Sequence, residues 1–144
     1  MTPLTDDDRR NVFNRVAFAR WMGVRRELSV DGRARLVVDS RPELENMIQS
    51  IHGGVVLTLL DVVMASAAVS KVDFEQTAVT LNLNTSFLRP GKGQLVADGE
   101  LIEISDGVAH CRGEVRDASG ETVARGMGTF RYLPMPALPP IPES

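Results

Sequence analysis

The stretch that decides the fold is GGVVLTLLDVVMASAAVSKV, residues 53–72. It is apolar on nearly every face when drawn as an α-helix, and it is long enough to be the main helix of the chain. A helix of this kind needs cover on most of its sides, which we expect from a sheet. Its most apolar part, residues 55–69, contains Thr58, Asp61 and Ser66 and is too short to span a bilayer, so we expect no membrane anchor.

The chain after residue 72 changes to the two-residue period of β-strands. The run VTLNLNTSF, residues 79–87, alternates apolar positions such as Leu83 with polar positions such as Thr80. Arg89-Pro90-Gly91 closes this strand. Three more strands are predicted, at residues 94–104, 108–117 and 122–133, joined by hairpin turns. We expect four antiparallel strands in sequence order, closing over the helix with their apolar face.

The N-terminal residues 1–22 have the spacing of an amphipathic helix, whose apolar positions include Phe13 and Trp21. Thr5 with Asp8 makes a capping box at its start. A glycine in the left-handed conformation commonly ends a helix, so Gly23 is the expected end.

Two strands follow, predicted at residues 24–30 and 34–39 as a hairpin around Asp31-Gly32. Residues 42–50 are polar and broken, which indicates a loop. The last eleven residues hold five of the eight prolines and are expected to form a polyproline-like tail. The predicted organisation is therefore an N-terminal helical arm (1–22), one α+β domain (23–133) and a proline-rich tail (134–144).

Composition and charge narrow the classes of function. At 144 residues, with 43% hydrophobic and 24% charged residues, the chain fits one soluble globular domain. A net charge of -3 argues against a nucleic-acid partner. Cys111 has no second cysteine for an intrachain disulfide, and with only His52 and His110 beside it we expect no zinc site. The acidic start MTPLTDDDRR favours a cytoplasmic location.

Asp61 indicates a functional site, because it is the one carboxylate within an otherwise apolar helix. Burying an unpaired charge is costly, so such a residue needs a partner or a purpose. The alternatives are that Asp61 lies on a narrow solvent strip with Thr58 and Ser66, or that it caps a neighbouring backbone N–H.

Paired glycines at the start of the helix are the second signal. Gly53-Gly54 follows Ile51-His52, and free N–H groups at a helix start attract negative charge, so an oxyanion hole can form there. A tight turn is the alternative. Gly53 and Asp61 lie eight residues apart, or about 12 Å at 1.5 Å per residue, which is too far for both to grip one carbonyl group. Two chains paired head to tail would resolve this gap.

These residues together resemble the hotdog-fold thioesterases of the phenylacetic-acid-degradation (PaaI-like) type. The matching pattern is Asn46, His52-Gly53-Gly54, Asp61 and then Arg89-Pro90-Gly91, within residues 23–133. The resemblance implies an antiparallel sheet curled round one long helix, with the N-terminal helix added. It also implies at least a homodimer, often with two dimers in a homotetramer.

The resemblance implies a role for each site residue. Asp61 would activate water or attack the thioester carbonyl, and the Gly53 N–H would polarise the carbonyl oxygen. Asn46 and His52 would assist in positioning, and Thr80 would supply a hydroxyl near the carboxylate. No metal or organic cofactor is implied. For the last three residues an ordinary structural role is the alternative, and the choice between nucleophile and base stays open for Asp61.

The phosphates of coenzyme A need cations, and Arg89 and Lys92 beside Pro90 are the natural candidates. Gly54 completes the expected substrate-binding set. The alternative is that these charges are ordinary solvated loop charges.

We therefore expect an acyl-CoA thioesterase that hydrolyses an acyl- or aryl-CoA thioester to free acid and coenzyme A. The chain has no Gly-x-Ser-x-Gly elbow, phosphate loop or dinucleotide fingerprint. A non-catalytic acyl-CoA binding module is an alternative that would not need Asp61, and a hotdog dehydratase is a weaker one. The small residues Ala124, Gly126 and Gly128 could make room for an acyl group, but close helix packing explains them better.

Overall fold

The computed structural model describes residues 12–138 and 140 of the chain. Helical segments marked η are short 3-10 turns. In chain order the elements are η1 (Val12–Arg15), α2 (Ala17–Met22), β1 (Arg25–Val30), β2 (Arg33–Val38), η2 (Pro42–Leu44), α3 (Gly53–Lys71), β3 (Gln76–Phe87), β4 (Leu95–Ser105), β5 (Val108–Arg116) and β6 (Thr122–Pro134).

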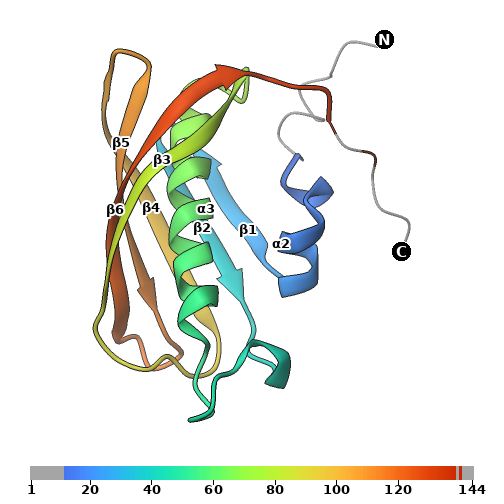
Figure 1. Ribbon diagram of the computed structural model, residues 1–144, viewed down its shortest axis with the longest axis vertical. Coiled ribbons are helices and arrows are strands. Elements are labelled where there is room, and N and C mark those ends of the chain that lie inside the picture. The colour runs from blue at the N-terminus through green and yellow to red at the C-terminus, as the bar shows by residue number, and fades with distance from the viewer. Residues whose placement is uncertain (1–11, 139, 141–144) are drawn as a thin grey trace.

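The six strands form one antiparallel sheet in the order β1-β2-β4-β5-β6-β3. Figure 1 shows α3 lying along one face of this sheet, which curls round the helix. All six strands contact α3. This arrangement confirms the predicted α+β class and the hotdog fold, in which a sheet wraps one long helix.

The expected order of the last four strands is wrong in one respect. β3 does not pair with β4, which follows it in the chain, but with β6, from Gln76 opposite Pro134 to Phe87 opposite Ala124. β4 instead lies between β2 and β5. The connection at residues 88–94 thus carries the chain from one edge of the sheet to its centre. Side-chain alternation reveals the two faces of a strand but not its neighbours, so the periodicity could not give this order.

The predicted hairpins are confirmed. Asp31 and Gly32 both have positive φ, 46° and 83°, as do Asp106 and Gly107, at 51° and 74°. Positive φ at both central residues is the requirement of the two-residue turn that matches the twist of a β-hairpin.

Close packing against glycines holds α3 to the sheet. A Cβ added at Gly99 of β4 would lie 2.6 Å from the Val63 carbonyl oxygen, so the helix backbone rests on the strand itself. A Cβ added at Gly126 of β6 would lie 3.0 Å from the Asn84 carbonyl oxygen of β3 and 3.4 Å from the Leu60 side chain of α3. Gly126 therefore serves packing, as predicted, because a larger side chain there would press on the neighbouring strand β3 and on the helix.

α3 has the length and composition of a membrane-spanning helix, contrary to the expectation that the apolar stretch is too short. Half of its most apolar window is buried inside this protein, and the sheet surrounds it. Its apolar character is that of a core helix.

The N-terminal segment is not one continuous helix, contrary to expectation. Within the described part, η1 ends at Arg15, Val16 has an extended backbone with ψ of 107°, and α2 begins at Ala17. Trp21 is exposed rather than in the core. The predicted capping box of Thr5 and Asp8 lies outside the described residues. The spacing of apolar residues predicted the wrong buried positions, because the break at Val16 changes which side chains face the rest of the domain.

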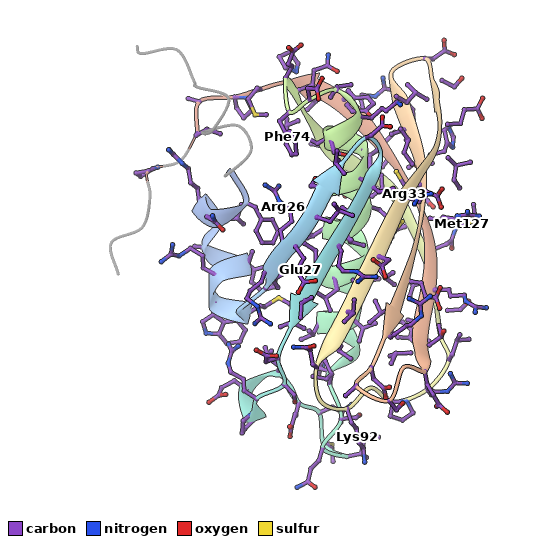
Figure 2. The ribbon with its side chains drawn as sticks, turned by 180° about the vertical axis from the view of Figure 1, so that it is seen from behind. Arg26, Glu27, Arg33, Phe74, Lys92 and Met127 are labelled. Atoms are coloured by element: carbon purple, nitrogen blue, oxygen red, sulfur yellow. The ribbon has the colours of Figure 1, made fainter. Side chains whose placement is uncertain are left out.

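A glycine cap ends this segment, and a cation–π contact fixes it to the domain. Gly23 ends α2 in the left-handed conformation, as predicted, and its N–H donates to the Arg20 carbonyl at 3.0 Å. The Arg26 guanidinium lies over the Phe13 and Phe74 rings, 5.7 and 5.3 Å from their centres, and Figure 2 shows Arg26 and Phe74 at the β1 side of the molecule. At the other end of the chain, residues 135–138 follow β6 without regular structure.

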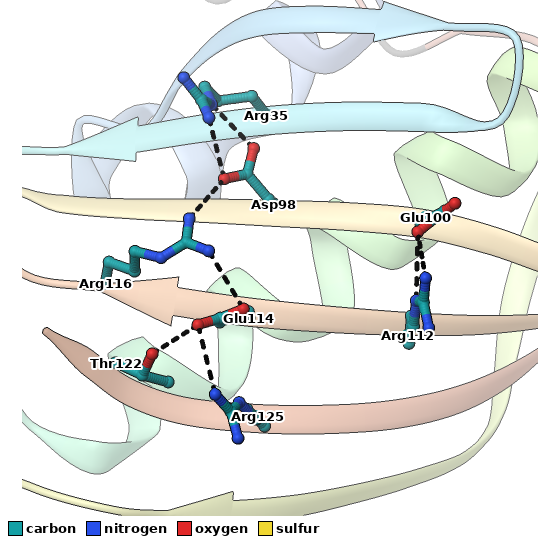
Figure 3. Close-up of polar contacts among 8 residues, drawn as sticks. All are labelled: Arg35, Asp98, Glu100, Arg112, Glu114, Arg116, Thr122 and Arg125. Carbon is teal, nitrogen blue, oxygen red and sulfur yellow. Dashed lines mark hydrogen bonds and ion pairs between the residues drawn. The ribbon is translucent and has the colours of Figure 1, made fainter. Parts of the chain in front are cut away.

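The outer face of the sheet, away from α3, carries charges that pair across neighbouring strands (Figure 3). Arg35 of β2 donates two hydrogen bonds to Asp98 of β4, at 2.7 and 3.0 Å. Arg116 of β5 is within 3.4 Å of the same carboxylate. Arg112 lies 2.8 Å from Glu100 and lowers the pKa of that carboxyl. Such cross-strand pairs stabilise the sheet modestly and keep this face polar.

The contact between Gly99 and Val63 can be tested by stability measurements. Gly99→Ala should lower the free energy of unfolding in urea by about 3 kcal/mol, at the upper end of the cost of overpacking, because the helix backbone cannot move aside. The control is Gly107→Ala, where an added Cβ meets nothing within 4 Å but φ is +74°. It should cost about 1 kcal/mol from backbone strain alone. Equal losses for the two variants would contradict the proposed packing.

Candidate functional site

The start of α3 is built by a histidine cap. His52 is the N-cap residue, and its Nδ1 accepts a hydrogen bond of 2.8 Å from the Gly54 N–H. The His52 carbonyl accepts from Val55 and Val56. The N–H of Gly53, the first helical residue, has no acceptor among the residues that the structure describes. The first turn therefore presents one uncommitted backbone donor, which is the group that an oxyanion hole requires.

Asp61 lies two turns further along α3 and is half-buried. The Thr80 hydroxyl, on β3, donates a hydrogen bond of 2.6 Å to Oδ1 of Asp61. The predicted proximity of a threonine hydroxyl to the carboxylate is thus present in the structure. The bond fixes one carboxylate oxygen, while Oδ2 has no hydrogen-bond partner among the residues that the structure describes.

A β-bulge turns Thr80 toward the helix. The register of β3 against β6 shifts between Thr80 and Asn82, so Thr80 is opposite the buried Phe130. The predicted alternation is therefore wrong for Leu81, which was expected on the apolar face and is 52% exposed, whereas Thr80 is exposed as predicted and bonds Asp61. An extra residue in a strand reverses the faces on one side of it, which re-aims a side chain.

Gly53, Leu57 and Asp61 follow one another at four-residue spacing and lie on one strip of α3 that the sheet leaves open. Leu57 is exposed and the other two are half-buried. The alternative in which Asp61 shares a solvent strip with Thr58 and Ser66 holds only for Thr58, because Ser66 is buried. Residues i, i+4 and i+8 share a helix face, so one strip carries both the free N–H and the carboxylate.

Asn46 shapes the loop that leads to the helix. Its Oδ1 accepts from the Ile48 and Ser50 N–H groups, both at 3.1 Å, and its Nδ2 donates to the Ser50 hydroxyl at 2.9 Å. Within one protomer these bonds hold Asn46 in its own loop. This is the local bonding typical of asparagine in turns.

The loop between β3 and β4 lies against the helix start. The Ile51 N–H donates to the Gly91 carbonyl at 2.9 Å. Because His52 follows Ile51, this bond brings the loop with Arg89, Pro90 and Lys92 close to His52. Arg89 is held by Glu121, at 3.4 Å, and donates to a backbone carbonyl of β6. Lys92 is exposed at this end of the molecule (Figure 2) and has no ion pair within the described part of the chain. Lys92 is thus the cation more available to an anionic ligand.

The predicted oxyanion donor, the Gly53 N–H, and the predicted base or nucleophile, Asp61, do not meet within one chain. Thr80 and Asp61 are in contact, whereas Gly53 and Asp61 are separated by two helical turns, about 12 Å. A residue that the sequence reasoning did not single out is Phe87, whose ring lies 3.6 Å from where a Gly53 Cβ would be. Its place at the end of β3 was visible in the sequence, but its contact depends on how the strand is laid along the helix.

Of two hollows in the surface, only the smaller is lined by predicted site residues. One of about 290 Å³ lies between α2 and the first turn of α3 and includes His52 and Gly54 in its lining. A larger one of about 1240 Å³ crosses the outer face of the sheet, but none of the predicted site residues lines it. The smaller hollow therefore belongs to the helix start.

Groups with strongly raised pKa values lie away from this strip. Burial raises the pKa of the Cys111 thiol to about 12, so the thiol stays protonated and is a poor nucleophile at neutral pH. Burial likewise raises the pKa of Tyr132 to about 12, and its hydroxyl donates to the Ala68 carbonyl at 2.6 Å. Among residues 12–138 and 140, no three His, Cys, Asp or Glu residues are grouped to hold a metal ion.

The fold defines a hotdog protein, and comparison places it in a family. The family model of the thioesterase superfamily matches residues 49–124, more than half of the chain. A protein of Halobacterium salinarum named as a proposed esterase is 33% identical over 124 residues, covering 78% of this chain and 82% of that protein. The chain belongs to the thioesterase superfamily, and this membership supports thioester hydrolase activity in general.

Solved structures agree with the fold. The E. coli PaaI protein of the phenylacetic acid degradation operon has a TM-score of 0.80 at 23% identity, over 88% of this chain and 91% of its own. A conserved Pseudomonas aeruginosa protein has a TM-score of 0.78 at 27% identity, over 82% of this chain and 94% of its own. A Bacillus halodurans protein solved with CoA has a TM-score of 0.73 at 29% identity, over 82% of this chain and 76% of its own. The resemblance to PaaI-like hotdog thioesterases is confirmed.

The histidine cap makes a prediction about stability. His52→Ala should lower the free energy of unfolding by about 1 kcal/mol, because the Gly54 N–H loses its acceptor. His52→Asn should retain nearly the full stability, since asparagine is among the best N-cap residues. Urea unfolding of both variants decides the matter, and an unchanged free energy of unfolding in His52→Ala would show that the cap does not hold the helix start.

Proposed function

We propose that this protein is an acyl-CoA thioesterase that hydrolyses an acyl- or aryl-CoA thioester to the free acid and coenzyme A. The observation that carries the proposal is that a free hydrogen-bond donor and a carboxylate lie on one open strip of α3. The strip presents an uncommitted N–H at Gly53 and a carboxylate at Asp61 that Thr80 holds by one oxygen. A donor for a developing oxyanion and a base or nucleophile are the two groups that thioester hydrolysis needs.

The chemistry follows from these two groups. The thioester oxygen accepts a hydrogen bond from Gly53, which stabilises the negative charge that develops on it. As a base, Asp61 takes a proton from water, whose oxygen attacks the carbonyl carbon. The C–S bond then breaks, and the thiolate of coenzyme A leaves and is protonated. As a nucleophile, Asp61 would form an anhydride that water cleaves to the same products. Both routes consume one water.

The edge strand β3 supports a site shared between two protomers. Phe87 lies beside Gly53 at one end of β3, and Thr80 lies beside Asp61 nearer the other end. If two β3 edges pair antiparallel about an axis near residues 83–84, position 87 of one chain opposes position 80 of the other. The Gly53 N–H of one protomer then faces the Asp61 carboxylate of its partner, which closes the 12 Å gap. A homodimer is the smallest assembly with this property, and a homotetramer of two dimers is compatible with it.

The phosphates of coenzyme A are assigned to the loop at residues 88–94. Lys92 is exposed and Arg89 retains part of its surface beside Glu121. The Ile51–Gly91 hydrogen bond places this loop next to the helix start. The relative from Bacillus halodurans, solved with CoA, supports a CoA ligand for this chain.

Two substitutions separate the roles on the strip. Asp61→Asn keeps the volume and removes the charge, and should lower kcat for thiol release by about 10²-fold or more. Gly53→Pro removes the N–H at the first helical position, where proline is tolerated, and His52 already has the extended backbone that precedes a proline, with ψ of 136°. It should lower kcat by about 10²-fold.

The measurement is thiol release from short, medium, long and aryl acyl-CoAs, with circular dichroism and melting temperature as controls for folding. Robust wild-type turnover that both folded variants lose would support the thioesterase. Tight acyl-CoA binding without turnover by the wild type would overturn it in favour of a non-catalytic binding module.

The shared site predicts a dimer that depends on the β3 edge. Leu81 is 52% exposed on this edge, so Leu81→Asp should put a charge into the interface and convert dimers into inactive monomers. Ile104→Asp is the matched control, because Ile104 is a similarly exposed residue near the β4–β5 hairpin, which the proposed interface does not include. Size-exclusion chromatography with light scattering checks both. A wild-type monomer that is fully active at micromolar concentration would contradict the shared site.

A further inference from the structure

The short helix α2 presents two aromatic rings on one exposed face. Phe18 and Trp21 are three residues apart, so they lie on the same side of the helix. Each is 57% exposed, whereas Ala19 and Met22 on the other side are buried. Large aromatic side chains are unusual on the exposed face of a helix that has a buried face available, which indicates that this face meets something.

Trp21 is held in place rather than free to move. The Arg41 guanidinium lies over its ring, 4.9 Å from the ring centre. The same guanidinium donates to the carbonyls of Trp21 and Met22, the latter at 2.9 Å, and so also ties down the end of α2. Arg41 stands at the start of η2, in the segment that leads to α3. A cation both stacked and hydrogen-bonded fixes a ring in one orientation.

The two rings and the first turn of α3 border the smaller hollow, which is open to solvent on one side. Its volume is about 290 Å³, and its lining includes Phe18, Trp21, Leu44, His52, Gly54 and Val55. Ligand pockets of whole small molecules measure about 300–1,000 Å³. This hollow therefore accommodates one compact group rather than an entire acyl-CoA.

The position of the hollow identifies which end of the substrate it receives. His52 and Gly54 line it and directly flank Gly53, the proposed donor to the thioester oxygen. Glu43 and Glu45 also line it; Glu43 pairs with Arg41 at 3.5 Å, and the Glu45 carboxylate would repel the phosphates of coenzyme A. The cation assigned to those phosphates, Lys92, lies in a different loop. The acyl group is the part of the substrate that is both adjacent to the carbonyl and uncharged.

We infer that Phe18 and Trp21 are specificity-determining residues that form the acyl-binding wall of the site. They favour a compact hydrophobic acyl group that ends between the two rings, because stacked or edge-on aromatic contacts need a partner of matching size. The inference rests on the proposed function, since it assumes that the thioester carbonyl lies at Gly53. The N-terminal segment thereby becomes part of the substrate site rather than an accessory to the domain.

Trp21 offers a direct test, because it is the only tryptophan in the chain. The Asp61→Asn protein, whose turnover is expected to be slowed by about 10²-fold or more, is titrated with phenylacetyl-CoA, acetyl-CoA and free coenzyme A while tryptophan emission is recorded. Phenylacetyl-CoA should shift the emission in a saturable way, and the other two should not. An equal shift with free coenzyme A, or no shift when calorimetry shows that phenylacetyl-CoA binds, would overturn the inference.

Kinetics of Phe18→Ala and Trp21→Leu give the second readout. The ratio of kcat/KM for phenylacetyl-CoA to that for acetyl-CoA should fall about tenfold or more in each, mainly through KM, because the lost contacts bind substrate and transition state alike. Ile104→Ala, a distant exposed apolar residue, should leave the ratio unchanged.

Light scattering and melting temperature accompany both variants. A loss of assembly, or an equal fall for both substrates, would show that the rings are a subunit contact or a structural support, and the inference would fail. If the wild type hydrolyses no thioester, the proposed function fails, while the emission titration still decides whether the hollow binds the acyl group.

Discussion

The direct contact between α3 and the centre of the sheet is the constraint on which the rest of the structure depends. Because the Val63 carbonyl rests on Gly99, the helix is set so deeply into the sheet that strands surround most of it. What stays uncovered is one narrow strip, and the chain uses that strip for Gly53, Leu57 and Asp61. The same packing that stabilises the fold thus selects which residues of an apolar helix can reach a ligand.

In the proposed dimer, the edge strand β3 links this strip to assembly. Its bulge aims Thr80 at Asp61, while its far end brings Phe87 to Gly53. β3 is the exposed edge of the sheet and lies beside two site groups. An exposed edge strand can pair with a strand of a second chain. In this account dimerisation is a requirement of the chemistry, because one helix cannot bring its first turn and its middle to the same carbonyl group.

The sequence was a good guide wherever the signal is local. The helix, the hairpins and the glycine that ends α2 all depend on nearest neighbours, and the family is confirmed by comparison. The candidate pair of Gly53 and Asp61 stays a prediction. The placement of β3 beside β6, the contact of Thr80 with Asp61 and the exposure of Trp21 depend on long-range pairing, on a bulge and on a break in a short helix. None of these leaves a periodic trace, so pattern reading could not supply them.

The most direct test of the shared site is to mix the two inactive variants Gly53→Pro and Asp61→Asn. In a mixed dimer, one site would carry both lesions and the other would be wild type, so exchange of subunits should restore about a quarter of wild-type thiol release at equal concentrations. If each site were built within one chain, every site would keep a lesion. Mixtures that exchange subunits, as mass spectrometry would show, and still release no thiol would contradict the account.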